Sequence, residues 1–180
     1  ISNPQSMSQV LGVAGPPGTG KTTLVRHGIA KALGRPFVQI SLGGATDAST
    51  LNGHSYTYEG ATWGRIAANL IQTQCMNPVI FFDEVDKVSD TQAGQEIIGL
   101  LIHLTDPTQN DEIMDRYFDG VPLDLSRALM IFSFNDVEAL NPILRDRLTV
   151  VHTKAFKPED KTKIALRHML PAVLKNVGFH

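Results

Sequence analysis

The sequence predicts a three-layer α/β/α protein in which a five-stranded parallel sheet lies between two layers of helices. Short apolar runs alternate with segments of helical period along the chain. A glycine-rich octapeptide separates the first apolar run from the first helical segment. Alternating strands and helices form βαβ units, whose parallel strands are covered on both faces. Loops that bind ligands then gather at the carboxyl ends of the strands.

Five segments are predicted to be strands because they are short, apolar and followed by polar or turn-forming residues. The first run, VLGVA, is continuous and apolar, the second alternates apolar with polar side chains, and the third is wholly apolar up to Asp83. The five segments are 10–14, 36–42, 78–82, 128–134 and 148–152.

The helical segments are recognised by apolar residues that recur every three or four positions and by their end signals. Gly34 ends the first helix, and Pro158 with two following acids begins the last one, which runs toward Met169 and breaks or restarts at Pro171. The predicted helices are 22–33, 48–51, 63–75, 91–104, 141–145 and the segment that starts at 158.

The composition is that of an ordinary globular domain and gives no general attraction to nucleic acid or anionic membrane. The chain has 180 residues, 42% of them hydrophobic and 19% charged, with a formal net charge of −2. Its one cysteine, Cys75, excludes an intrachain disulfide and favours a reducing compartment. No stretch is long and apolar enough to be a membrane span, so we expect no membrane partner.

The octapeptide GPPGTGKT fits the phosphate-binding loop pattern G-x-x-x-x-G-K-[ST]. Its glycines allow successive backbone N–H groups to face phosphate oxygens, Lys21 supplies a cation, and Thr22 offers a hydroxyl to Mg²⁺. The alternative is a glycine-rich turn with a solvated lysine. The predicted nucleotide-binding residues are Gly15, Pro16, Pro17, Gly18, Thr19, Gly20, Lys21, Thr22 and Thr23.

Two acids follow the third predicted strand and resemble the second nucleotide-binding motif of P-loop ATPases. In this interpretation Asp83 helps to hold Mg²⁺ and Glu84 is the general base that activates water. An acid pair at the end of a strand is also typical of a helix N-cap or a solvated turn.

Polar residues after the later strands complete the predicted site. Asn135 follows the fourth strand, where ATPases of the AAA+ class carry the water-orienting residue called sensor 1; an ordinary turn asparagine is the alternative. Arg147, with Arg145 as second choice, is the candidate arginine finger that reaches a neighbouring subunit's γ-phosphate, unless both are surface arginines.

Together these motifs resemble the ATPase domain of Lon proteases within the AAA+ superfamily. Further stretches of Lon type cover nearly the whole chain. They are 37–44, the pattern Gly-His, Thr-Tyr, Gly-Ala and Gly-Arg-Ile within 53–66, and the segments 104–110, 117–119 and 124–126. The peptidase domain of Lon, with its Ser–Lys pair, is not part of this sequence.

The resemblance implies a AAA+ nucleotide-binding domain over 1–156, followed at 157–180 by the first helix of a truncated helical lid. It also implies ATP or ADP with Mg²⁺ as ligands, and a homo-oligomeric ring, usually hexameric, that threads polypeptide through its pore. Tyr58 would be the pore aromatic, with Trp63 nearby; core or interface packing is the alternative for Tyr58. Glu59 departs from the aliphatic residue usual after that tyrosine. The expected location is the cytoplasm or another reducing compartment such as the mitochondrial matrix.

Four functions follow from these patterns. The first is a Mg²⁺-dependent ATPase motor acting on protein substrates. The second is a AAA+ ATPase that remodels another cargo; nucleic acid is disfavoured because the expected pore loop is not basic. The third is a nucleotide-binding assembly scaffold with slow hydrolysis, and the fourth is a small-molecule kinase. The combination of Glu84, Asn135 and Arg147 favours the first over the third and fourth.

Overall fold

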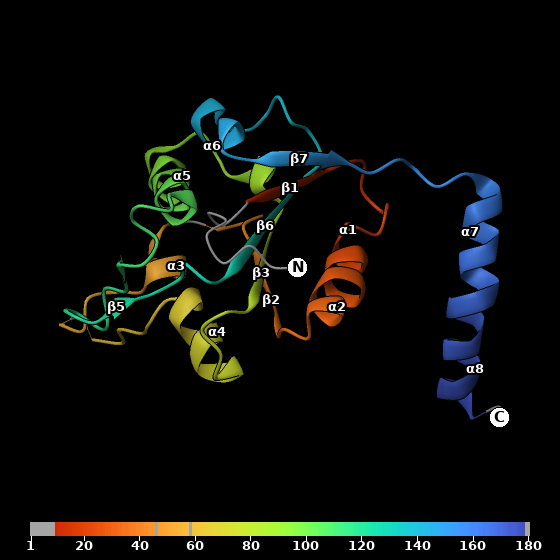
Figure 1. Ribbon diagram of the computed structural model, residues 1–180, viewed down its shortest axis with the longest axis horizontal. Coiled ribbons are helices and arrows are strands. Elements are labelled where there is room, and N and C mark those ends of the chain that lie inside the picture. Colours follow the sequence, from red (N-terminus) through yellow and green to blue (C-terminus); the bar gives the residue numbers. More distant parts are fainter. Residues whose placement is uncertain (1–9, 46, 58, 179–180) are drawn as a thin grey trace.

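The central feature of the protein is a five-stranded sheet, seen in a computed structural model that describes residues 10–45, 47–57 and 59–178 (Figure 1). All its strand pairs are parallel, in the order β2-β3-β6-β1-β7. The predicted α/β fold class is therefore confirmed. The strands are β1 (Leu11–Ala14), β2 (Phe37–Ser41), β3 (Val79–Asp83), β6 (Leu129–Phe134) and β7 (Thr149–His152).

The strand order places distant parts of the chain side by side. Strand β1 lies between β6 and β7, so that Ala14 is opposite Phe134 on one side and His152 on the other. Strand β6 in turn pairs with β3. The carboxyl ends of β1, β6 and β3 are therefore adjacent, and the loops that follow them share one edge of the sheet.

The helices follow the predicted segments closely. Gly34, with φ of 63°, ends the first helix, which runs through α1, η1 and α2, and the Thr91 side chain accepts a hydrogen bond from Gly94 N–H at the start of α5. The helical elements are α1 (Lys21–Thr23), η1 (Leu24–Ala30), α2 (Lys31–Leu33), α3 (Ser49–Asn52), α4 (Arg65–Thr73), η2 (Val85–Lys87), α5 (Gln92–Thr105), α6 (Pro142–Asp146), α7 (Pro158–Ile164), η3 (Ala165–Met169) and α8 (Leu170–Val177).

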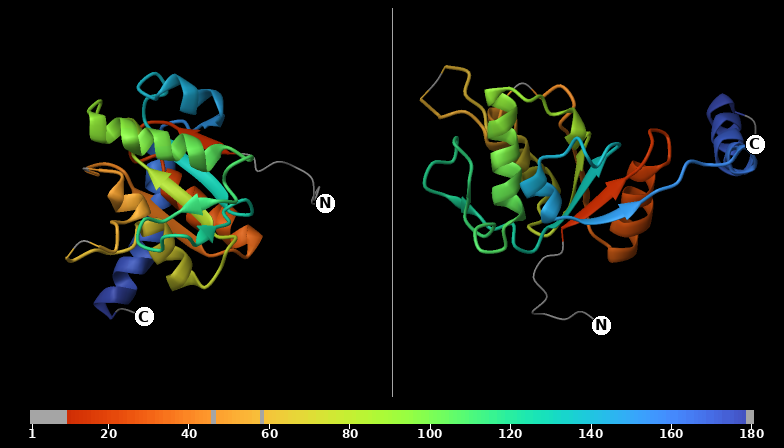
Figure 2. Two further views of the ribbon diagram at one scale, coloured as in Figure 1. Left: turned by 90° about the vertical axis from the view of Figure 1, so that its left-hand side faces the viewer. Right: turned by 90° about the horizontal axis from the view of Figure 1, so that it is seen from above.

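Helices cover both faces of the sheet (Figure 2), and the buried side chains form two clusters. Side chains of β3 alternate between them: Phe81 packs with Val25 of the first helix, whereas Phe82 packs in the larger cluster with α4, α5 and α6. The Phe82 ring stacks on Phe132 with centroids 4.9 Å apart. Complete burial of each phenylalanine contributes roughly 2–3 kcal/mol, which anchors β3 and β6 in the centre of the sheet.

Two local features differ from or refine the prediction. The segment 106–119 is predicted to be irregular, but β4 (Ile113–Met114) pairs antiparallel with β5 (Pro122–Leu123). Strands of two residues are too short to show an alternating pattern. At Pro171 the helix restarts rather than ends, because α8 begins at Leu170 and continues to Val177.

Helices α7, η3 and α8 stand apart from the sheet at the end of an extended connection (Figure 1). None of the described side chains in these three elements is buried. Among the residues that the structure describes, no helix is both long enough and apolar enough to cross a membrane.

Candidate nucleotide-binding site

The loop between β1 and α1 turns sharply before the first helix begins. Gly18 and Gly20 have φ values of 75° and 77°, a left-handed conformation that side chains with a Cβ adopt at a cost. A Cβ at Gly15 would collide with the side chain of Thr153, at the end of β7. The loop therefore depends on glycine at these positions, and it lies directly over the carboxyl ends of β1 and β7.

The Lys21 side chain folds back under this loop. Its Nζ donates hydrogen bonds to the carbonyl oxygens of Gly15 at 2.5 Å and Pro16 at 3.3 Å, and to Oδ1 of Asn135 at 2.8 Å. The residue is only 9% exposed. Burial lowers the pKa of Lys21 from its ordinary value of 10.5, and the nearby charges of Asp83 and Asp86 oppose that shift.

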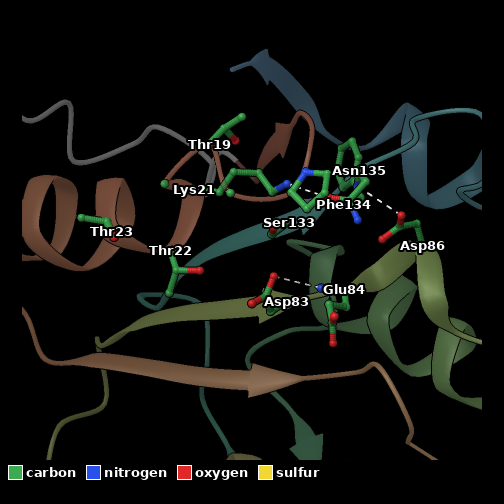
Figure 3. A pocket seen from close by; sticks show the side chains of 13 residues that line it. Thr19, Lys21, Thr22, Thr23, Asp83, Glu84, Asp86, Ser133, Phe134 and Asn135 are labelled. Carbon is green, nitrogen blue, oxygen red and sulfur yellow. Dashed lines mark hydrogen bonds between the residues drawn. The ribbon is translucent and has the colours of Figure 1, made fainter. Parts of the chain in front are cut away.

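Glu84 follows β3 in a left-handed conformation with φ of 60° and ψ of 43°, which is unusual for a residue with a side chain. Its Oε2 accepts a hydrogen bond of 3.0 Å from the hydroxyl of Ser41, at the end of β2. A Cβ at Gly43 would collide with the same carboxylate. The Glu84 carboxylate is therefore directed toward β2, away from Lys21 (Figure 3).

Asp83 is oriented by neighbours on both sides. Its Oδ1 accepts from the Glu84 backbone N–H at 3.1 Å, and its Oδ2 accepts from Nε2 of Gln39 at 3.2 Å. Gln39 is itself held by Arg26, whose guanidinium donates to Oε1 of Gln39 at 3.2 Å and lies over the Phe37 ring. These contacts restrict the carboxylate of Asp83 at the edge of the pocket.

Asn135 is hydrogen-bonded to Asp86, an acid that follows Asp83 and Glu84 in the sequence. Its backbone N–H donates to Oδ2 of Asp86 at 3.2 Å, while its side chain receives the Lys21 hydrogen bond. The second oxygen of Asp86 and the hydroxyl of Ser133, a residue only 1% exposed, are buried without a hydrogen-bond partner among the described residues. Both residues line the same pocket.

These residues surround a pocket of about 300 Å³. Figure 3 shows Lys21 and Asn135 directed toward one another on one side and Asp83 on the other, with Thr22 between the helix and β3. The oxygen donors of Thr22 and Asp83 are of the kind that Mg²⁺ prefers, so these residues fit such an ion. Thr19, which donates to the Pro16 carbonyl at 2.9 Å, and Thr23 also line the pocket.

Both candidate arginine fingers are held by contacts within the chain. Arg147 donates to the carbonyl oxygen of Ile102 at 3.2 Å and forms an ion pair of 3.3 Å with Asp106. Arg145 pairs with Glu138 at 2.9 Å. The pKa of Asp106 is below its ordinary value of 3.8, chiefly because the hydroxyl and backbone N–H of Thr108 donate to it, with a smaller effect of Arg147.

Of the two predicted pore aromatics, Trp63 is not among the residues that line this pocket. Trp63 is 45% exposed, and its ring stacks on Phe118, with centroids 5.9 Å apart, and meets the edge of Tyr117 at 5.5 Å. Tyr58 lies outside the described residues.

Sequence reasoning missed several residues of the site, namely Ser41, Gln39, Asp86 and Thr153. Gln39 and Ser41 point to the same side of β2, and Ser41 is the register partner of Asp83. This relation would identify both residues, but it can be used only when β2 and β3 are known to be neighbours, which the sequence alone does not give.

A glycine-rich loop that opens a helix, at the edge of a parallel sheet of this strand order, defines a nucleotide-binding ATPase of the P-loop class. The comparison with family models gives the particular family. Residues 11–155 match the model "ATPase family associated with various cellular activities (AAA)", and the chain belongs to this family.

Similar proteins confirm the resemblance to Lon. The chain is 43% identical over 180 residues to a Lon protease homolog of Acanthamoeba polyphaga mimivirus, covering 99% of the chain and 18% of that protein. It is 42% identical to the Lon protease of Desulfosudis oleivorans, covering 98% and 21%. For a mitochondrial Lon protease homolog of Yarrowia lipolytica the identity is 40%, covering 94% and 14%. The chain thus spans between 14% and 21% of the length of these relatives.

Proposed function

We propose that this chain is a Mg²⁺-dependent ATPase module that works in a homo-oligomeric ring, of hexameric form, and drives the unfolding or translocation of polypeptide. Membership of the AAA family and the identity to Lon proteases support this function. The observation that carries it is the 2.8 Å hydrogen bond between Lys21 and Asn135, which joins the glycine-rich loop to β6 above the carboxylates of β3.

In this proposal residues 15–23 bind the phosphates of ATP. Backbone N–H groups of the loop and the start of the first helix face the anion, and Lys21 provides the positive charge. Thr22 and Asp83 hold Mg²⁺, which when bound neutralises charge on the phosphate oxygens. A second pocket of about 860 Å³ extends from Gly20 and Leu24 to Phe156 and Ile164, and we propose it for the nucleoside.

Glu84 is the proposed general base. It accepts a proton from water as the water oxygen bonds to the γ-phosphorus and the bond to the ADP oxygen breaks. Asn135 orients that water, and Lys21 balances charge that develops on the phosphate. The Ser41 hydroxyl donates to Oε2 of Glu84 at 3.0 Å, and this hydrogen bond restrains the carboxylate toward β2.

Arg147 is the proposed finger for a neighbouring subunit, with Arg145 as the second choice. The segment 157–180 is the proposed beginning of a helical lid, which follows the nucleotide-binding domain at 1–156. Tyr58 and Trp63 are the proposed contacts to polypeptide. A reducing compartment, such as the cytoplasm or the mitochondrial matrix, is the proposed location.

One observation favours a second candidate, an assembly scaffold with slow hydrolysis. The hydrogen bond from Ser41 directs the Glu84 carboxylate toward β2 and away from Lys21. A scaffold of this kind would bind ATP and assemble but turn it over slowly even with polypeptide present.

The test uses the Glu84→Gln variant, which keeps the shape of the side chain but removes the base. We expect it to bind ATP with Mg²⁺ like the wild type, to lose about a hundredfold or more in turnover, and to form rings measurable by sedimentation velocity. Glu96→Gln, an exposed position, is the matched control. The wild type should hydrolyse ATP faster when reduced, carboxymethylated lactalbumin, a permanently unfolded polypeptide, is added.

Normal turnover of Glu84→Gln would remove Glu84 as the base. The motor function would be contradicted if the wild-type chain stayed monomeric with ATP, or if its rate of ATP turnover did not change when the unfolded polypeptide was added. The scaffold function would be supported if the chain assembled and its slow rate of turnover did not change on addition of polypeptide.

A further inference from the structure

A buried carboxylate, Asp115, joins two surface segments of the protein. Asp115 is only 2% exposed. Its Oδ2 accepts a hydrogen bond of 2.9 Å from the backbone N–H of Gly64, 51 residues earlier in the chain. Its Oδ1 accepts a bond of the same length from the backbone N–H of Tyr117. The carboxylate thus connects the end of loop 53–64 to the hairpin that contains β4 and β5.

Loop 53–64 and the hairpin meet at a junction around Asp115, where the backbone is packed so closely that glycine is required at two positions. A Cβ at Gly53 would lie 2.8 Å from Oδ1 of Asp115, and a Cβ at Gly64 would collide with the carbonyl of Leu51. The backbone N–H of Arg116 also donates to the carbonyl of Asn52 at 2.7 Å. Both ends of loop 53–64 are therefore fastened at the same place on the hairpin.

An aromatic contact extends the junction to the surface. Trp63, the residue before Gly64, stacks on Phe118 at an interplanar angle of 23°, and Tyr117 meets it edge-on at 77°. Figure 1 and Figure 2 show the loop and the hairpin together at the edge of the molecule farthest from α7 and α8. A half-exposed tryptophan held in this way is oriented by the hairpin as well as by its own loop.

The hairpin also leads back to the nucleotide pocket. After β5 the chain reaches Leu125, which is fully buried and whose N–H donates to the carbonyl of Asn110 at 2.8 Å. It then enters β6, the strand that ends beside Asn135. A displacement of loop 53–64 is therefore linked, through Asp115 and the hairpin, to the strand that carries one side of the pocket.

We propose that Asp115 is a positioning residue that clamps loop 53–64 to the hairpin of β4 and β5, so that polypeptide bound at this loop alters the rate of ATP turnover. This inference rests on the proposed function of the loop as a polypeptide contact. The clamp acts through Gly64 and Trp63 and does not touch the nucleotide. Loss of the carboxylate therefore separates the two activities: basal turnover remains, and its response to polypeptide is lost.

The chain contains its own reporter, because Trp63 is its one tryptophan. The Asp115→Asn variant retains the size of the side chain but replaces one acceptor oxygen with an NH₂ group, which cannot accept a hydrogen bond from a backbone N–H. We expect its tryptophan emission to shift to longer wavelength and acrylamide quenching to increase. Asp119→Asn, an exposed position in the same hairpin with the same change of charge, is the control and should match the wild type.

The second measurement is ATP turnover with and without reduced, carboxymethylated lactalbumin. Asp115→Asn should keep the basal rate and the nucleotide affinity of the wild type and lose the stimulation, whereas Asp119→Asn should keep both. Unchanged tryptophan emission, or full stimulation in Asp115→Asn, would overturn the clamp. If the wild type itself is not stimulated, the proposed function fails, and the emission of Asp115→Asn still decides whether the carboxylate holds Trp63.

A purely structural role of Asp115 would lower stability and leave the stimulation intact, which would also overturn the proposal. Should Asp115→Asn fail to fold, as judged by circular dichroism, Phe118→Ala provides the second test. It removes the ring on which Trp63 stacks and leaves the carboxylate in place. It should increase quenching of Trp63 and weaken the stimulation; wild-type stimulation in this variant would refute the clamp.

Discussion

The side-chain oxygen of Asn135 accepts a hydrogen bond of 2.8 Å from Nζ of Lys21, although the two residues are 114 positions apart in the sequence. The same ammonium group also donates to the carbonyl oxygens of Gly15 and Pro16. A lysine ammonium has only three donors, so all of them are engaged within the chain. A phosphate that binds Lys21 must replace at least one of these contacts, which couples phosphate binding to the position of Asn135.

We expect Lys21→Ala to weaken ATP binding at least about tenfold, because a hydrogen bond to a charged group contributes roughly 1.5–3 kcal/mol. Titration with a fluorescent ATP analogue measures the effect. Lys31→Ala, at an exposed position later in the same helix, is the matched control and should bind like the wild type. Equal affinities for the two variants would contradict the assignment of the phosphate loop.

Ser41→Ala should increase basal ATP turnover about two- to tenfold, since the net contribution of one hydrogen bond is roughly 0.5–1.5 kcal/mol. The hydroxyl holds Glu84 toward β2, and its removal frees the carboxylate to reach water. Steady-state phosphate release gives the rate. In a Glu84→Gln background the same substitution should have no effect. A slower Ser41→Ala enzyme would mean that Ser41 assists the glutamate rather than restrains it.

Arg147→Ala should reduce turnover by about a thousandfold while ATP still binds, as expected for an arginine finger. Arg145→Ala should have a much smaller effect, because in this proposal only Arg147 contacts the γ-phosphate of the neighbouring subunit. Mixing Arg147→Ala with Glu84→Gln should restore part of the activity, since each subunit supplies what the other lacks. If mixing restores nothing, the action of Arg147 on a neighbouring subunit is unsupported.

The hydrogen bonds from Thr108 to Asp106, with a smaller contribution of Arg147, predict a dependence of stability on pH. The pKa of Asp106 is lower in the folded protein than its ordinary value of 3.8, so the carboxylate stabilises the fold above that value. This stabilisation is lost as the pH falls through the lowered pKa. Urea unfolding should therefore find Asp106→Asn less stable than the wild type near pH 7, and the difference should shrink on acidification below 3.8.

Asp111→Asn is the control for this measurement, because Asp111 is exposed and five positions further along the chain. The difference in stability between Asp111→Asn and the wild type should not shrink in the same way as the pH falls. A constant difference between Asp106→Asn and the wild type over the whole range would show that the titration of Asp106 does not contribute.

The central strands β1, β3 and β6 were predictable because they are buried on both faces. Segments such as 78–82 must then be apolar throughout, and this property can be read without knowledge of their neighbours. The hairpin of β4 and β5 was not predictable. Its strands have two residues each, and the hairpin depends on contacts with Asn52 and Gly64, which lie far away in the sequence.

The same division applies to the candidate site. The glycine-rich loop could be recognised because its backbone conformation depends on a short local pattern of glycines, including Gly18 and Gly20. The roles proposed for Asp83 and Glu84 followed from their place after a strand. Ser41, Gln39 and Thr153 could not be found in this way, because ordinary polar residues acquire a role only when the sheet brings a carboxylate or a loop next to them.

The amino-acid sequence by itself determined the alternation of strands and helices, the phosphate loop and the likeness to Lon ATPases, since each of these depends on residues close together in the chain. Only the tertiary structure decided that Ser41 holds Glu84, that Arg147 is paired with Asp106 and that Asp115 fastens loop 53–64. The reason is physical: a hydrogen bond or ion pair depends on the distance between two groups in space. The strand order β2-β3-β6-β1-β7 and the packing of helices and loops around the sheet create those distances from segments that the sequence keeps apart.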